Sequence, residues 1–145
     1  MEKVRIRLAV LAVLAGALSL FAAAPAAVAD NLRLHAVMTG SQESPPNSSP
    51  AVGQATVYFP RDNTICVLLR VSGLSAPATG AHIHRAPTGN IVVPLTAPTN
   101  GFSFTCRTVS AELLAELRSN PSTFYVNVHS SNYPAGEIRG FLSFA

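Results

Sequence analysis

Residues 123–130 read Thr-Phe-Tyr-Val-Asn-Val-His-Ser, and the alternation in this stretch decides the fold class of the chain. Side chains of an extended strand point to opposite faces in turn, so Phe124, Val126 and Val128 fall on one face and His129 falls on the other. Strict alternation of this kind is typical of a β-strand that is buried on one side. The stretch therefore predicts a strand in a sheet with a packed inner face and a polar outer face.

The same pattern continues outward in both directions, and turn residues such as Gly, Pro and Asn interrupt it about every ten residues. Eight strands are expected, over residues 32–39, 53–59, 64–71, 79–85, 91–95, 102–108, 123–130 and 137–144. One short helix follows Ser110, a typical N-cap residue, and ends at Asn120-Pro121. This order predicts an all-β domain, a sandwich of about seven to eight strands with Greek-key or immunoglobulin-like connections, similar to superoxide dismutase.

Residues 1–29 have the composition of a secretory signal peptide. Three basic residues stand within the first seven positions, an apolar run covers residues 8–24, and Ala27-Val28-Ala29 fits a small-residue cleavage site. A membrane anchor is the alternative, because the apolar run approaches the roughly 17 residues that a spanning helix needs. Cleavage after Ala29 would leave a secreted or periplasmic domain, residues 30–145, without a membrane span.

Charged residues are few, at 12% of the chain, and the formal net charge is +3. Residues 30–145 contain seven Arg, no Lys, two Asp and four Glu, which leaves a net charge of +1. Nucleic-acid binding requires clusters of basic side chains that neutralise several phosphates, so nucleic acid is excluded as a partner. The domain also lacks the patterns of a serine triad or of paired catalytic carboxylates, so no catalytic residue is assigned and an enzyme is not expected.

Cys66 and Cys106 are the two cysteines of the chain. In an exported domain of this size, two cysteines most simply form a disulfide. The loop between them, about 40 residues, corresponds to roughly 4 kcal/mol in the chain-entropy model. We therefore expect a stabilising Cys66–Cys106 bridge.

Three histidines are expected on one face. His82 and His84 stand two residues apart in one strand, and His129 lies opposite the inward valines of another. Three imidazoles with one open position form catalytic zinc sites and several copper centres, and the His-x-His pattern resembles the copper-binding strand of copper/zinc superoxide dismutases. One interpretation is a copper or zinc site with redox or superoxide chemistry. The alternative is that these histidines only form hydrogen bonds that tie strands together. His35 lies outside the group.

The segment Asn132 to Gly140 is the other distinctive stretch. Gly136 belongs to a tight turn, after which Glu137 and Arg139 share one strand face and pair with each other or across strands. A structural role is the favoured interpretation. Glu137 is also the carboxylate nearest in sequence to His129, so it is a candidate to accept a hydrogen bond from that imidazole and orient it.

Six fragments, taken in order, resemble the CHRD family, which is named after chordin. The fragments are Gly40-Ser41-Gln42-Glu43-Ser44-Pro45-Pro46, Gly53-Gln54-Ala55, Val71-Ser72-Gly73-Leu74, Ala81-His82-Ile83-His84, Tyr125-Val126-Asn127-Val128-His129 and the segment from Asn132 to Gly140. The resemblance implies a compact, all-β, sandwich-like domain of the kind found singly in exported microbial proteins. Its signature residues include the three histidines and Glu137. A structural motif is assigned to Asn127, Gly136, Glu137 and Arg139.

The resemblance implies little about activity. The leading hypothesis is an exported, non-catalytic module that is structural or binds an unknown extracellular or periplasmic protein. The other hypothesis is a copper- or zinc-binding metalloprotein with its site at His82, His84 and His129.

Overall fold

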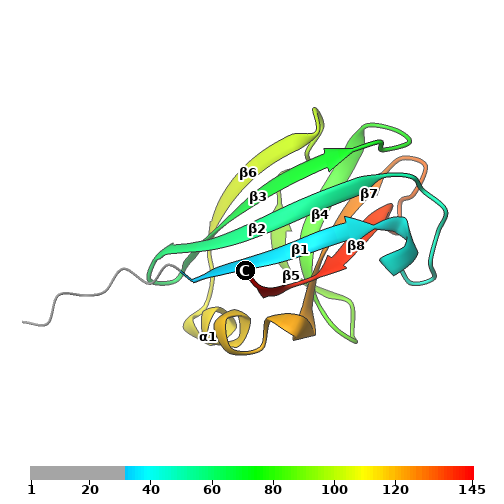
Figure 1. Ribbon diagram of the computed structural model, residues 1–145. Coiled ribbons are helices and arrows are strands. Elements are labelled where there is room, and N and C mark those ends of the chain that lie inside the picture. Colours follow the sequence, from blue (N-terminus) through cyan, green and yellow to red (C-terminus); the bar gives the residue numbers. More distant parts are fainter. Residues whose placement is uncertain (1–31) are drawn as a thin grey trace, which may run out of the picture.

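The computed structural model describes residues 32–145, so the expected signal peptide, residues 1–29, lies outside the described part of the chain (Figure 1). All eight expected strands are present, and the last is split at Leu142 into two. The strands are β1 (Arg33–Thr39), β2 (Val52–Arg61), β3 (Thr64–Ser72), β4 (Ala78–Arg85), β5 (Asn90–Leu95), β6 (Phe102–Thr108), β7 (Phe124–Ser130), β8 (Ile138–Phe141) and β9 (Ser143–Phe144). The expected helix is α1 (Ala111–Ser119), and short 3-10 turns stand at η1 (Gly40–Gln42) and η2 (Pro121–Thr123).

The strands form one antiparallel sheet in the order β5-β4-β7-β8-β1-β2-β3-β6, with β9 beside β1. The sheet curls on itself, and in Figure 1 β1, β2 and β3 lie in front of β4 and β5. Its two edge strands meet through side chains: Thr96 N, just after β5, donates to Thr105 Oγ1 at 2.9 Å, and Arg107 Nε donates to the Pro94 carbonyl at 3.2 Å. The all-β prediction is confirmed, with the two layers of the sandwich belonging to one nearly closed sheet.

The core lies between the two layers. Phe124, Val126 and Val128, expected to face inward, are fully buried, as is Leu117 of α1, which covers one end of the fold. Ser110 caps that helix by accepting a hydrogen bond from Leu113 N. Alternation thus places the apolar face of each strand inside and leaves the outer face of β4 and β7 to polar and aromatic residues.

Cys66 and Cys106 are directly opposite one another in the β3–β6 pair and form a disulfide, as predicted. Their Cα atoms lie 4.0 Å apart. The bridge joins the edge strand β6 to its neighbour β3. No helix within residues 32–145 is long and apolar enough to span a membrane.

Gly140 stands where β8 passes close to β1. A Cβ at this position would lie 2.3 Å from the Val37 carbonyl oxygen, a backbone atom that cannot move away without breaking the strand pairing. We expect Gly140→Ala to lower the free energy of unfolding by about 2–3 kcal/mol, as overpacking of a filled site does. Urea unfolding followed by circular dichroism measures the change.

The matched control for this substitution is Gly80→Ala on β4. The nearest atom to its Cβ would be His82 Cε1 at 3.5 Å, which is ordinary van der Waals contact. If Gly140→Ala lowers the free energy of unfolding no more than Gly80→Ala does, the steric explanation is wrong.

Candidate metal centre

The histidine cluster lies on two neighbouring strands. β4 and β7 pair antiparallel, with Gly80 opposite His129, His82 opposite Asn127 and His84 opposite Tyr125. Because side chains alternate, all three imidazoles emerge on the outer face of this pair. One ring nitrogen of each histidine lies within 4.8 Å of the nitrogens of the other two. The structure therefore brings together His82, His84 and His129, which the sequence had placed only on a common face.

Backbone carbonyls determine which ring nitrogens of two histidines carry protons. His84 Nδ1 lies 2.8 Å from the Gly89 carbonyl oxygen, and His129 Nδ1 lies 3.0 Å from that of Pro134. A carbonyl oxygen only accepts hydrogen bonds, so each Nδ1 is the donor and each Nε2 of a neutral ring keeps its lone pair. Metal-binding histidines in proteins are typically oriented by this kind of hydrogen bond.

His84 Nε2 is buried and has no hydrogen-bond partner. A buried polar atom without a partner carries a desolvation cost of about 1–3 kcal/mol. In native proteins such an atom calls for an explanation, and a bound ion is one. The lone pair of His84 Nε2 therefore fits a metal ligand better than a structural hydrogen-bonding group.

His82 completes the group through its contact with His129. His82 Nδ1 lies 3.1 Å from His129 Nε2, and because that Nε2 is an acceptor, His82 Nδ1 donates when no metal is bound. Three nitrogens around one ion at bond lengths of about 2.0–2.1 Å lie roughly 3.3–3.6 Å apart. The His82–His129 pair is close to that separation already. Metal binding through His82 Nδ1 would require its proton to move to Nε2 and the rings to rotate toward one another.

Burial favours the neutral form of the three rings. Desolvation is the main cause that lowers the pKa of His82, and the neighbouring His129 and His84 lower it further. Burial likewise lowers the pKa of His84 and of His129, against the effect of their carbonyl partners and with a smaller contribution from Arg139. The neutral imidazole is the form that binds metals.

These lowered pKa values predict a pH-dependent stability. The pKa of a histidine in the unfolded chain is about 6.5. At a pH between the lowered folded pKa and this value, the unfolded chain therefore binds more protons than the folded protein does. The free energy of unfolding therefore rises with pH in this window; the contribution is complete above about pH 6.5 and is lost as the pH falls through the folded pKa values. We expect the metal-free protein to be less stable to urea at about pH 5 than at about pH 7.5.

The matching variant for this measurement replaces His82, His84 and His129 together by glutamine. The difference in stability between the two pH values should be smaller in the triple variant than in the wild-type protein. An equal difference in both proteins would show that the cluster does not cause it.

A layer of buried side chains lies beside the cluster. The Tyr125 ring stacks on His84, with centroids 4.9 Å apart and planes within 4°. The Arg139 guanidinium lies 4.1 Å from the centre of the Tyr125 ring and pairs with Glu43 Oε2 at 3.0 Å. Asn127 Nδ2 donates to Glu43 Oε1 at 2.6 Å. This Glu43–Arg139–Tyr125 row connects the segment after β1 to His84.

Glu43 and Tyr125 were not expected at the site. Both stand in fragments that carry the family resemblance, but neither has a spacing that links it to the histidines. The segment containing Glu43 reaches β7 and β8 only through tertiary contacts. Burial raises the pKa of Glu43, and Arg139 opposes that effect.

Glu137 does not orient His129, which was one of the roles expected for it. Its Oε1 accepts hydrogen bonds from Ser49 Oγ at 2.8 Å and from Ser75 N at 2.7 Å, while the Pro134 carbonyl accepts from His129. Burial alone would raise the pKa of Glu137, but hydrogen bonds from serine side chains and the Ser75 backbone outweigh it and lower the pKa. Glu137 thus ties together loops distant in sequence, because its side chain lies among segments 47–50 and 73–75 rather than over the histidines.

Gly136 allows the turn before Glu137 to lie close to the buried layer. Its φ is 140°, and a Cβ there would lie 2.4 Å from Asn127 Nδ2 and 2.6 Å from Glu43 Oε1. Asn127, Gly136 and Arg139, expected as a structural motif, therefore converge on Glu43. The Glu137 carboxylate instead accepts hydrogen bonds from Ser49 and Ser75.

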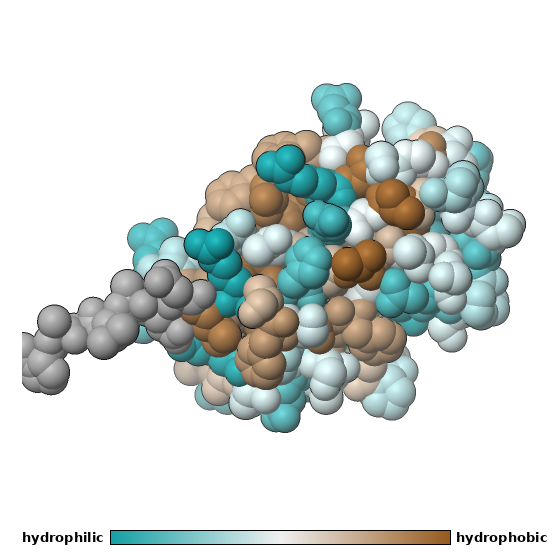
Figure 2. All heavy atoms as spheres, viewed as in Figure 1, coloured by the Kyte–Doolittle hydropathy of each residue, from teal (hydrophilic) through white to brown (hydrophobic). Residues whose placement is uncertain are grey.

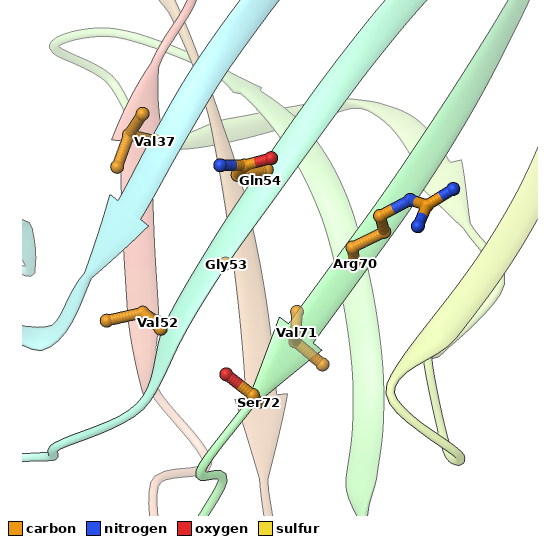
Figure 3. Close-up of a pocket in the computed structure, with 7 residues that line it drawn as sticks. All are labelled: Val37, Val52, Gly53, Gln54, Arg70, Val71 and Ser72. Carbon is orange, nitrogen blue, oxygen red and sulfur yellow. The ribbon is translucent and has the colours of Figure 1, made fainter.

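The histidines lie apart from the hollow shown in Figure 3. That hollow, of about 280 Å³, is on the outer face of β1, β2 and β3 and is lined by Val37, Val52, Gly53, Gln54, Arg70, Val71 and Ser72. No histidine or carboxylate of residues 32–145 lines it. On the face seen in Figure 2, apolar groups are separated by polar ones. The three-histidine cluster on β4 and β7 is thus separate from this hollow.

Comparison with models of protein families places most of the chain in one family. Residues 34–142 match the family model described as the CHRD domain. A search of curated proteins finds no match for the chain. The matched range contains the three histidines and the whole buried layer with Glu43, Tyr125 and Arg139.

Proposed function

The chain belongs to the CHRD domain family, and from that premise we propose that it is a binding module whose ligand is a single copper or zinc ion held by His82, His84 and His129. Membership of the family favours a binding or structural role rather than a particular reaction. The three-histidine group then gives the binding role a chemical class of ligand.

The observation that carries this proposal is the buried, unpartnered Nε2 of His84 beside two other ring nitrogens. If the cluster served only to tie β4 to β7, each buried nitrogen would be expected to have a hydrogen-bond partner. The carbonyls of Gly89 and Pro134 instead hold two rings with Nε2 unprotonated. The Nε2 of His84 has no partner, and that of His129 accepts only from His82. The structural alternative explains the His82–His129 contact but leaves His84 Nε2 unexplained.

The donor set favours copper or zinc over other cations. Imidazole nitrogens suit zinc and copper, whereas calcium and magnesium require oxygen ligands. A bound ion would keep an open position for water or another small ligand and would supply Lewis acidity or, for copper, electron transfer. The protein contributes the orientation of the rings and a partly dry environment.

Export from the cytoplasm is part of the proposal. The disulfide and the CHRD domain are both consistent with an extracellular location. Residues 1–29 supply the corresponding signal, with cleavage expected after Ala29. N-terminal sequencing of the exported protein tests this point directly.

Metal analysis tests the function. The purified protein, stripped with a chelator and then titrated separately with Cu and Zn, should bind one ion of at least one metal per chain. The double variant His82→Ala/His84→Ala should bind none at that site, while His35→Ala, on the outer face of β1, should behave as wild type. No stoichiometric ion, or the same affinity in the double variant, would show that the histidines have the structural role instead.

A further inference from the structure

The cluster contains no negatively charged ligand. The two buried carboxylates of residues 32–145 are engaged elsewhere: Glu43 with Arg139 and Asn127, and Glu137 with Ser49 and Ser75. A metal at His82, His84 and His129 would therefore keep its full positive charge. Because no anionic ligand offsets the second charge of a divalent ion, this donor set favours a monovalent ion more than a site with a carboxylate ligand would.

Arg139 adds a positive charge on the same side of the sheet. Its guanidinium rests on one aromatic ring, Tyr125, and that ring stacks directly on His84. The side chains of Arg139 and Glu43 are only 15% and 4% exposed, so water screens their charges weakly. The partly buried guanidinium is thus separated from the proposed metal position by the Tyr125 and His84 rings.

From this arrangement we infer that the site binds Cu(I) in preference to Cu(II), and that Arg139 sets a large part of that preference. The inference rests on the proposed function, since it requires a copper ion at the three histidines. Three imidazoles satisfy the low coordination number of Cu(I), whereas Cu(II) favours tetragonal sites with more donors. Cu(II) also carries one more positive charge than Cu(I), so repulsion from Arg139 disfavours it more.

The expected size of the Arg139 effect follows from electrostatics. One unit charge at about 10 Å, in a medium with an effective dielectric constant of about 20, changes an equilibrium by roughly tenfold. Removing the charge should therefore lower the ratio of Cu(I) affinity to Cu(II) affinity by roughly tenfold. For a one-electron couple this corresponds to a reduction potential lower by about 59 mV.

The experiment compares the wild-type protein with Arg139→Gln and Arg139→Lys. Cu(I) affinity is measured without oxygen by competition with a coloured Cu(I) chelator, and Cu(II) affinity is measured by competition with an amino-acid chelator. Wild type should favour Cu(I), Arg139→Gln should lose about tenfold of this preference, and Arg139→Lys should retain most of it because the charge remains. If Arg139 acted only through packing, the Arg139→Lys variant would not restore the ratio of Cu(I) affinity to Cu(II) affinity.

A second variant keeps the test valid if Arg139→Gln does not fold. Glu43→Gln removes the negative partner of Arg139 and should shift the ratio the other way, toward Cu(I). Unchanged ratios in the charge variants, or a wild-type preference for Cu(II), would overturn the inference while leaving the metal site in place. Binding of zinc without copper would also overturn the inference alone, whereas no binding of either metal would overturn the proposed function with it.

Discussion

Replacing His84 by glutamine is expected to lower the affinity for the bound metal by about 100- to 1000-fold, a substantial share of the binding free energy of a site with few ligands. His84 is the most buried of the three ligands, and the Gly89 carbonyl and the Tyr125 ring hold its orientation. Its loss leaves His82 and His129, which are both half-buried and are close enough to hydrogen-bond with each other. Competition titration with a chelator of known affinity measures the change.

Thermal unfolding gives a second readout of the same substitution. A ligand at 100 times its dissociation constant stabilises the folded state by about 2.7 kcal/mol, which for a domain of this size raises Tm by roughly 10 °C. Metal should produce that rise in the wild-type protein and in His35→Gln, and little or no rise in His84→Gln. An equal rise in all three would place the bound metal elsewhere.

Removing the disulfide should produce the largest loss of stability. The double variant Cys66→Ala/Cys106→Ala is expected to lose about 4 kcal/mol of unfolding free energy, because the bridge closes a loop with a sequence separation of 40 residues in the unfolded chain. The bridge also holds β6, the edge strand of the sheet, against β3. Urea unfolding of the metal-free variant and of the chemically reduced wild-type protein should give similar losses.

The same variant separates stability from metal binding. Cys66 and Cys106 lie on β3 and β6, whereas the histidines lie on β4 and β7, on the other half of the curled sheet. Under conditions where the variant is folded, its metal affinity should therefore stay within about threefold of wild type, as expected for distant independent sites.

The stability measurement also has an outcome that contradicts the expectation. If the double cysteine variant loses less than about 1 kcal/mol of unfolding free energy, the unfolded chain gains little conformational freedom when the bridge is removed.

Much of the fold could be predicted from local patterns. Alternation in residues 123–130 places Phe124, Val126 and Val128 in the core, and the structure confirms this because the period of a strand is a property of the backbone itself. The division of the last expected strand into β8 and β9 was not predicted. Both parts pair with β1, at different positions along it, and no signal within residues 137–144 specifies that pairing.

The partners of the polar residues were predicted less well. Glu137 was expected beside His129 because the two are close in sequence, yet its partners are Ser49 and Ser75. Arg139 pairs with Glu43, nearly one hundred positions earlier in the chain. Proximity in sequence is a weak guide to such contacts, because loops that pack over a sheet bring distant segments together.

The sequence by itself determined that the chain is an all-β domain and that His82 and His84 share a face, since both follow from the two-residue period of an extended backbone. Only the tertiary structure decided that His129 lies next to them, through the register that places it opposite Gly80. It also decided that the Gly89 and Pro134 carbonyls orient two of the rings and that Arg139 lies above Tyr125. Strand register and loop packing depend on contacts made throughout the core, so no short stretch of sequence determines them.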